Sequence, residues 1–266
     1  MIPNRMAFFW HGGPMSWMRY MTLASFRRWN PEWEMQLYTP TLPCAGKTWN
    51  TIECDDMEYA GPDYNALVES LEIARHQWKS PVPHMAAAPA SDLFSYDYLS
   101  TIGGWYSDMD ILWCRPMIDV AAKTDVVLCK TANVFAVGLM ASSGGSPFWG
   151  DVFRLAGHSY RTNEYQSCGV LVLDNHIGKV DSLDKRYPAQ HVVVLPDATV
   201  YPWDYRQTHR IFSETNTVPE NSTGIHWFGG HPNAQRWNNR LTADNCRDYD
   251  NTFCTYAQRA LNPCTT

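Results

Sequence analysis

Short apolar runs alternate with helical patterns at the start of the chain. Residues 6–10 (MAFFW) form an apolar and aromatic run that ends at the glycine-rich segment 11–14, as in a strand followed by a tight turn. Apolar positions in 15–29 then recur near helical spacing until Pro31, and 34–38 forms a second strand candidate. This order of strand, turn, helix and strand predicts an α/β sheet.

Two further helices are predicted in the middle of the chain. Residues 64–78 place Leu67, Leu71, Ala74 and Trp78 on one face and predict an amphipathic helix. Residues 89–102 are apolar nearly all round, which indicates a buried helix, and the glycine pair that follows would end it.

The second half mixes strand and helix patterns. Short β-rich runs cover 105–113, 125–129, 134–141, 169–173, 191–195 and 224–228. Helical patterns at 147–157 and 242–261 accompany these runs. No repeat, charge block or low-complexity linker interrupts the chain, so we expect one continuous α/β domain over 1–266.

Composition limits the function classes. The chain has 27 acidic and 21 basic residues, a net charge of −6, whereas proteins that bind a nucleic-acid backbone normally carry a basic excess. Residues 1–10 lack the basic start and long apolar run of a signal peptide, and the longest near-apolar stretch, 134–141, is too short to span a membrane. We therefore expect a cytoplasmic protein without a membrane segment, and nucleic acid is disfavoured as a partner.

The cysteine pattern does not indicate a structural zinc site. None of the eight cysteines forms a CxxC pair. Cys246, Cys254 and Cys264 cluster near the end of the sequence and could pair in an oxidising compartment. Without a secretion signal, free thiols are favoured over disulfides.

The sharpest chemical feature is an acidic pair in the segment 103–112 (GGWYSDMDIL). Asp108 and Asp110 are two residues apart, so on an extended segment both carboxylates project to the same side. Such a pair can hold a hard divalent cation through oxygen ligands. An acidic turn is the alternative, but the buried helix, the glycine pair and the apolar continuation around the motif favour a metal site.

The sequence here resembles a family of enzymes. Residues 90–96 (ASDLFSY) followed by 103–110 (GGWYSDMD) resemble the core block of DxD-containing retaining sugar transferases of the GT-A type. The closest resemblance is to the group of yeast-type mannosyltransferases, α-galactosyl and α-N-acetylglucosaminyl transferases and the glucosylating domain of large clostridial toxins. Residues 2–13 and 25–34 are similar to the family's first strand, nucleotide-facing loop and following helix.

Later segments extend the resemblance. Residues 166–174 (QSCGVLVLD) are similar to the donor-sugar strand of glycogenin-like and lipooligosaccharide galactosyltransferases. Residues 225–230 (IHWFGG), with Trp237, look like the histidine segment that closes the metal site in those enzymes. One departure is Ser95, because toxin-like members have an arginine at that position, so an arginine contact to the nucleotide is not carried over.

The resemblance implies an architecture and a reaction. The fold would be a Rossmann-like mixed sheet flanked by helices, with a nucleotide-binding half at about 1–113, a donor-sugar and acceptor half at about 114–240 and a helical end at about 241–266. The reaction would move a hexose from a nucleoside diphosphate sugar to a hydroxyl on a glycan or small molecule, with retention of the anomeric configuration. UDP is favoured over GDP as the nucleotide.

The resemblance also implies a metal cofactor, Mn²⁺ or Mg²⁺. Asp110 would bind the ion directly, Asp108 would bind it through water or hold the ribose, and His226 would be the third protein ligand. Imidazole and carboxylate suit such an ion. A core histidine beside Trp227 is the alternative for His226.

Other candidate residues follow from the same segments. Gln166 and Asp174 are the polar residues expected nearest the reacting sugar carbon, and Asp92 would contact the ribose or the sugar. The other candidates for nucleotide or donor contacts are Phe8, Trp10, His11, Gly12, Tyr106, Ser167, Gly169, Gly229 and Trp237. Core packing is the alternative for Phe8 and for any single tryptophan.

Two other functions are compatible with the sequence. One is a non-catalytic carbohydrate-binding module that keeps the aromatic surface without turnover, against which the intact acidic pair argues. The other is glycosylation of a macromolecule, either a protein or a hydroxylated DNA base.

Overall fold

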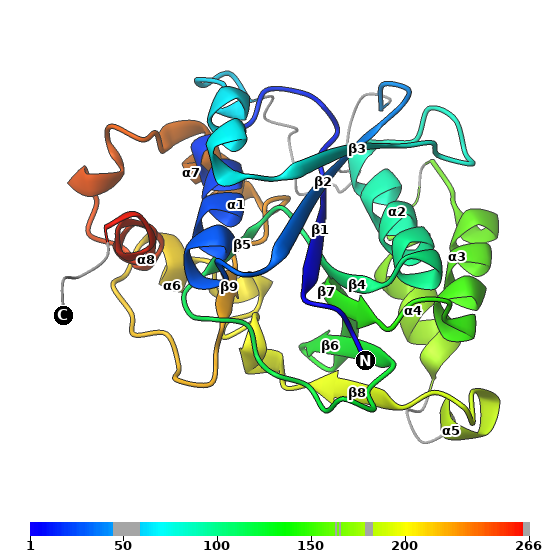
Figure 1. Ribbon diagram of the computed structural model, residues 1–266. Helices are drawn as coiled ribbons and strands as arrows, with labels where there is room; N and C mark the ends of the chain where they lie inside the picture. The colour runs from blue at the N-terminus through cyan, green and yellow to red at the C-terminus, as the bar shows by residue number, and fades with distance from the viewer. Residues whose placement is uncertain (45–58, 163, 165, 179–182, 263–266) are drawn as a thin grey trace.

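Seven strands form one mixed sheet in the order β3-β2-β1-β4-β7-β6-β8 (Figure 1). The computed structural model describes residues 1–44, 59–162, 164, 166–178 and 183–262. The strands of this sheet are β1 (Arg5–Phe9), β2 (Glu34–Pro40), β3 (Ala74–Trp78), β4 (Gly104–Ser107), β6 (Val126–Thr131), β7 (Val134–Ser142) and β8 (Val192–Leu195). Strands β3, β2, β1 and β4 are parallel, and β7 then pairs antiparallel with β4. The sheet therefore changes direction beside β4.

Helices cover both faces of this sheet. They are α1 (Trp17–Trp29), α2 (Ala87–Thr101), α3 (Pro147–Ser159), α4 (Val170–Ile177), α5 (Leu183–Arg186), α6 (His209–Phe212), α7 (Pro232–Arg240) and α8 (Thr252–Leu261). In Figure 1, α2, α3 and α4 lie together on one side, and α1, α6, α7 and α8 lie on the other. This is the mixed α/β architecture that the sequence predicted.

Alternation along β1 explains the two cores. Met6 and Phe8 belong to the core on the α1 side, and Ala7 and Phe9 belong to the core under α2, because successive side chains of a strand point to opposite faces. The Phe8 ring packs against Phe26 of α1 with centroids 5.8 Å apart. Strand β1 is thus buried on both sides, as expected for a central parallel strand.

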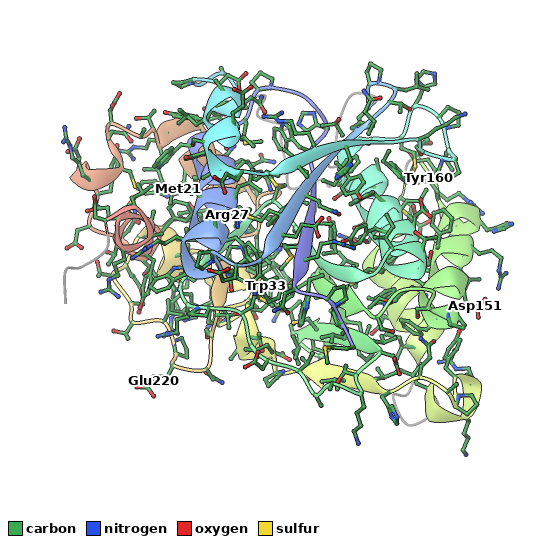
Figure 2. The ribbon with its side chains drawn as sticks, in the orientation of Figure 1. Met21, Arg27, Trp33, Asp151, Tyr160 and Glu220 are labelled. Carbon is green, nitrogen blue, oxygen red and sulfur yellow. The ribbon has the colours of Figure 1, made fainter. Side chains whose placement is uncertain are left out.

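Arg27 fixes α1 against its neighbours. Its guanidinium donates to the backbone carbonyls of Pro31 and Trp33, at 3.0 and 2.8 Å, and to that of Leu71 at 3.0 Å. Arg27 and Trp33 are labelled in Figure 2, where both lie at the α1 side of the sheet. These bonds connect the end of α1 to the start of β2.

A glycine pair joins α2 to β4. Gly103 and Gly104 have φ values of +80° and +110°, which residues with a side chain rarely adopt. A Cβ built on Gly103 would lie 2.5 Å from the backbone nitrogen of Gly144. The pair therefore allows a tight turn into β4 under a neighbouring backbone.

The predicted helix at 64–78 was wrong. The structure has a 3₁₀ helix at Asn65–Leu71 and then strand β3, which pairs in parallel with β2 at the edge of the sheet. Only Val68 is buried in the 3₁₀ helix, and only Trp78 in β3. The apolar spacing thus came from two short elements, and pairing with β2 decided the conformation of the second.

The strand predicted at 169–173 was also wrong. Residues 170–177 form helix α4, and the segment similar to a donor-sugar strand is a turn followed by this helix. A short run of Val and Leu does not separate a buried strand from a buried helix. Val172, Leu173 and Ile177 of α4 are buried in the core that also contains α2 and α3.

The C-terminal part is less helical than expected. Within 242–261 the structure has a 3₁₀ turn at Cys246–Asp248 and helix α8. Cys246 and Cys254 are buried free thiols in contact with each other, and Cys264 lies outside the described residues. Across the described parts of the chain, no helix has the length and apolar character needed to cross a membrane.

Candidate metal and donor site

The acidic pair lies in the turn between β4 and β5 (Ile111–Trp113). Strand β5 pairs antiparallel with β9 (Gly224–His226), and the register sets Ile111 opposite His226. The backbone N–H of Trp227 also donates to the carbonyl of Asp110 at 2.8 Å. This small ladder brings the histidine from the second half of the chain next to the acidic turn.

Asp108, Asp110 and His226 converge as the sequence predicted. The Nε2 atom of His226 lies 3.2 Å from Oδ1 of Asp110 and 3.7 Å from Oδ2 of Asp108. Asp110 and His226 are buried, whereas the Asp108 side chain is 24% exposed. The cluster is thus buried on one side and open on the side of Asp108.

Neighbouring donors orient both carboxylates. The Tyr106 hydroxyl donates to Oδ1 of Asp108 at 2.7 Å, and the Gly229 N–H donates to Oδ2 of Asp110 at 2.6 Å. Each carboxylate therefore has one oxygen held by the protein and its other oxygen facing His226. Such outer hydrogen bonds fix the direction of metal ligands.

The remaining ligand atoms fit a divalent cation. One atom from each of the three residues lies within 4.8 Å of the other two. Two ligands of an ion such as Mg²⁺, each about 2.1 Å from it, lie roughly 3 Å apart, so small shifts suffice to close the set. Two carboxylates and one imidazole suit Mn²⁺ and leave positions open for phosphate oxygens or water.

The charges of the cluster stabilise one another. Burial opposes ionisation of Asp110, but the His226 imidazolium outweighs it and holds the pKa of this carboxyl below its usual range. Burial would lower the pKa of His226, but the Asp110 and Asp108 carboxylates raise it to about 9. Without a cation, His226 therefore carries a proton at neutral pH.

This proton predicts a pH dependence of stability in the metal-free protein. The pKa of His226 is about 9 when folded and about 6.5 when unfolded, so its stabilising effect is complete below pH 6.5 and lost as the pH rises to 9. In EDTA, the free energy of unfolding should fall over this window by up to about 3 kcal/mol more than in His226→Gln. Urea unfolding at pH 6 and pH 9 measures the difference, and parallel losses in both proteins would contradict it.

A second polar cluster lies beside the first. A side chain on Gly169 would overlap the carboxylate of Asp92 and the amide oxygen of Gln166, so these three residues are in contact. Gln166 has φ of +62°, a conformation that non-glycine residues adopt rarely, and its Oε1 accepts the Val170 N–H at 3.0 Å. The turn before α4 thus presents its polar groups to Asp92 of α2.

Hydrogen bonds link Ser91, the neighbour of Asp92 on α2, to the metal cluster. Ser91 Oγ and Tyr106 Oη are 2.6 Å apart, and Tyr106 continues to Asp108. Burial and the nearby Asp108 charge raise the pKa of Asp92 well above its usual range. This shift favours the protonated form of Asp92, which can donate a hydrogen bond.

Tyr106→Phe should weaken metal binding while the fold persists. The phenyl ring keeps the packing, but Asp108 loses the donor that orients it, which typically costs about 10- to 100-fold in metal affinity. Titration with Mn²⁺ measures the loss. Tyr38→Phe is the matched control, because it removes a buried hydroxyl from the same core on β2. Equal Mn²⁺ affinity in the two variants would contradict the prediction.

Part of the chain is similar to a known protein family. Residues 14–127 match the family model described as "Glycosyltransferase sugar-binding region containing DXD motif". This segment is similar to a glycosyltransferase sugar-binding region. It contains the acidic turn, whereas His226 lies outside it. A comparison with curated protein sequences found no match.

A solved structure shares the fold. The glycosyltransferase GlyE of Streptococcus pneumoniae TIGR4 superposes with a TM-score of 0.50 at 12% identity, over 98% of this chain and 61% of that chain. The chain therefore spans less than two thirds of GlyE. The fold is that of GT-A type glycosyltransferases.

Two other similar structures are more distant. The UDP-bound glycosyltransferase domain from the YGT toxin has a TM-score of 0.48 at 11% identity, over 73% of this chain and 79% of that chain. The galactosyltransferase LgtC in complex with donor and acceptor sugar analogues has a TM-score of 0.41 at 11% identity, over 96% and 95%.

Two aromatic candidates for the nucleotide pocket lie in the core instead. Phe8 is fully buried against α1, which agrees with the alternative of core packing for this residue. Tyr106 is 1% exposed, with its ring against Phe94 and its hydroxyl on Asp108. Neither ring has a free face for a base, because helices cover both faces of the sheet at β1 and β4.

The candidates Trp10, His11 and Gly12 lie together in the loop after β1. The Trp10 indole N–H donates to the carbonyl of Gly13 at 2.8 Å, and its ring lies 4.4 Å from that of His11. Gly12 has φ of +93° and is exposed. This loop follows β1, which is parallel to β4, so both it and the acidic turn lie at the carboxyl ends of neighbouring strands.

Three other candidates serve contacts away from the metal cluster. Asp174 accepts the Phe135 N–H of β7 at 3.3 Å, and Ser167 bonds the backbone of Arg161. Trp237 of α7 stacks on Phe212 with centroids 5.9 Å apart. By contrast, Gly229 lies in the cluster, where its N–H holds Asp110.

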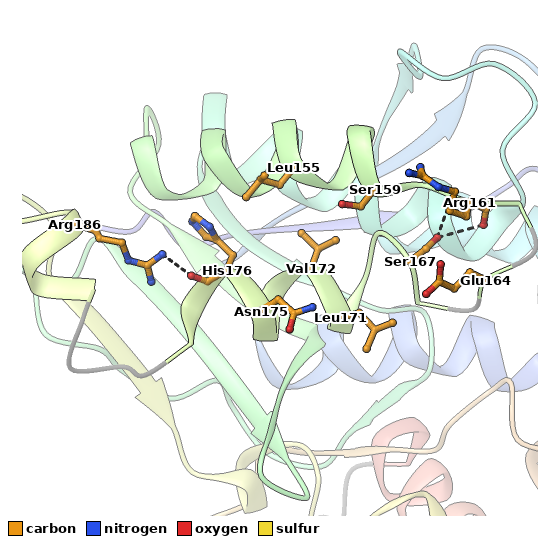
Figure 3. Close-up of a pocket in the computed structure, with 10 residues that line it drawn as sticks. All are labelled: Leu155, Ser159, Arg161, Glu164, Ser167, Leu171, Val172, Asn175, His176 and Arg186. Atoms are coloured by element: carbon orange, nitrogen blue, oxygen red, sulfur yellow. Dashed lines mark hydrogen bonds between the residues drawn. The ribbon is translucent and has the colours of Figure 1, made fainter.

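The structure also has a cavity of about 540 Å³ between α3, α4 and α5 (Figure 3). Its lining includes Ser167 but none of the three metal-ligand candidates. The arginines at its two ends donate to backbone carbonyls, Arg161 to His158 and Arg186 to His176. The cavity is therefore separate from the acidic turn.

Sequence reasoning missed one residue of the site. Arg19 of α1 lies 3.9 Å from Oδ2 of Asp110 through its NH1 atom. Nothing in the sequence distinguishes it from Arg27 and Arg28 on the same helix.

Proposed function

We propose that the protein transfers a hexose from a nucleoside diphosphate sugar to a hydroxyl acceptor, with a divalent cation held by Asp108, Asp110 and His226. The observation that carries this proposal is the convergence of three ligand atoms whose outer partners already orient them. The match of residues 14–127 to a DXD-containing sugar-binding region supports the same reaction.

The cation explains how the donor would be activated. When bound, a divalent ion supplies Lewis-acid stabilisation of the negative charge that develops on the departing diphosphate. The chain's own residues orient that ion, and the β9 ladder keeps His226 in place opposite the acidic turn.

The second cluster would bind the donor sugar. Asp92 would hydrogen-bond a sugar or ribose hydroxyl, and burial and the Asp108 charge raise its pKa, which favours the form that donates. Gln166 would place its side chain near the positively charged sugar carbon, where a carbonyl oxygen tolerates the charge. We infer that Asp174 instead supports β7, because its carboxylate is engaged by Phe135.

The remaining details of the reaction rest on resemblance. UDP is the proposed nucleotide, with GDP as the alternative, and Mn²⁺ is the proposed ion, with Mg²⁺ as the alternative. The acceptor is proposed to be a hydroxyl of a glycan, and the anomeric configuration is proposed to be retained.

A donor panel tests the proposal. UDP-glucose, UDP-galactose, UDP-N-acetylglucosamine and GDP-mannose are incubated with Mn²⁺, and release of the nucleotide is measured. We expect release from a UDP-sugar, loss of activity in EDTA and recovery when Mn²⁺ is restored. Release that persists in EDTA would overturn the metal assignment, and absence of both release and nucleotide binding would overturn the transferase assignment.

A further inference from the structure

Hydrogen bonds hold the backbone of Arg19 in place near the metal cluster. Ser16 caps α1, and its side chain accepts the Arg19 N–H at 3.2 Å. Ser16 is itself held by Asn238 of α7 at 2.5 Å. The first turn of α1 is therefore fixed to the helix that follows the β9 segment.

The side chain of Arg19 extends to the β9 segment, which consists of β9 and the turn after it (224–230). Its guanidinium lies over the Trp227 ring, 4.7 Å from the centroid, and a side chain on Gly229 would overlap it. Burial, and after it the charge of Arg19, lowers the pKa of His11 in the β1 loop. Arg19 thus lies between the β1 loop, the acidic turn and the β9 segment.

The guanidinium has donors to spare. Its distance of 3.9 Å from Asp110 is too long for a hydrogen bond, and Oδ2 of Asp110 already accepts the Gly229 N–H. Among the described residues, none accepts a hydrogen bond from this guanidinium, and its side chain is 19% exposed. Arg27 and Arg115, by contrast, each donate to several backbone carbonyls.

We propose that Arg19 binds the diphosphate of the donor and stabilises it as it departs. This inference rests on the proposed function. A diphosphate between the β1 loop and a cation on Asp110 would pass the guanidinium, whose planar donors match phosphate oxygens in pairs. Stacking on Trp227 holds the guanidinium in this position before the donor arrives.

The positive charge of Arg19 would act on the leaving group of the reaction. The bond between the anomeric carbon and the diphosphate oxygen breaks, and its electron pair stays on that oxygen. The acceptor oxygen forms the new bond to the anomeric carbon, and its proton passes to the departing diphosphate. A fixed positive charge beside the oxygen that gains negative charge stabilises the transition state more than the ground state.

Arg19→Gln and Arg19→Lys test the proposal. Calorimetry with UDP in saturating Mn²⁺ should show about 10- to 100-fold weaker binding in Arg19→Gln, since a charged hydrogen-bond partner is lost. Arg19→Lys should recover part of the affinity, and Mn²⁺ binding without nucleotide should change less than threefold. Arg28→Gln is the matched control, because Arg28 lies on the same helix over Trp29 and away from the cluster.

Each outcome decides the assignment. Unchanged UDP affinity in folded Arg19→Gln would overturn it, and so would an equal loss of Mn²⁺ affinity, because Arg19 would then act only on Asp110. If the wild type binds UDP with Mn²⁺ but turns over no donor, the transferase assignment fails while the role of Arg19 in diphosphate binding stands. If the wild type does not bind UDP at all, both fail.

Discussion

Asp110→Asn should lower the rate of Mn²⁺-dependent sugar transfer by at least about 1,000-fold, which corresponds to about 4 kcal/mol of transition-state stabilisation. The amide keeps the size of the side chain but removes the negative charge from the residue closest to His226 and Arg19. The cation would then lose the more deeply buried of its two carboxylate ligands. The rate of nucleotide release from the active donor measures the effect, and Mn²⁺ titration measures the loss of affinity.

A control separates the site from general effects of charge. Asp151→Asn removes a carboxylate that is labelled in Figure 2 on α3. There Asp151 contacts Arg154 and Tyr187, and the substitution should leave transfer within about twofold of the wild type. If Asp110→Asn kept a tenth of the activity and its Mn²⁺ affinity, Asp110 would not be a metal ligand.

Gly103→Ala should destabilise the fold by about 2 to 4 kcal/mol. The added Cβ would lie 2.5 to 2.9 Å from the backbone of Ser143 and Gly144, which cannot move like a side chain. The φ of +80° adds strain of about 1 kcal/mol or more for any residue with a side chain. The midpoint of urea unfolding measures the loss.

The opposite result is expected at a helical glycine. A Cβ on Gly150 of α3 meets no atom within 4 Å beyond its chain neighbours and the adjacent helix backbone, so Gly150→Ala should leave stability unchanged or raise it by up to about 1 kcal/mol. Similar effects of the two substitutions would show that the glycine turn before β4 is not under steric constraint.

The sequence predicted the structure correctly where the residues that form a feature are close together in the chain. The α2 helix, the glycine pair and the acidic residues follow one another along the chain, so their pattern predicted both the element order and the metal candidates. His226 was also predicted, because its segment resembles a known one. The turn between β4 and β5 differs from the extended geometry expected, but its carboxylates still converge.

Tertiary contacts decided what the pattern could not. Strand β3 has four exposed residues and forms because β2 provides a parallel partner. Helix α4 has the composition of a buried strand and becomes a helix where α3 and β7 cover it. Arg19 gains its place from Trp227 and Gly229, which are distant in sequence, so no local signal could single it out.

The ladder between β5 and β9 has a consequence for the newly made chain. Asp110 and Gly229, which holds it, are 119 residues apart, so the acidic turn leaves the ribosome long before its partners. At a synthesis rate of about 5 to 20 residues per second, the histidine segment is made roughly 6 to 25 seconds after the two carboxylates. A cation can be held by all three ligands only when this segment has docked, so metal capture would mark the completion of folding.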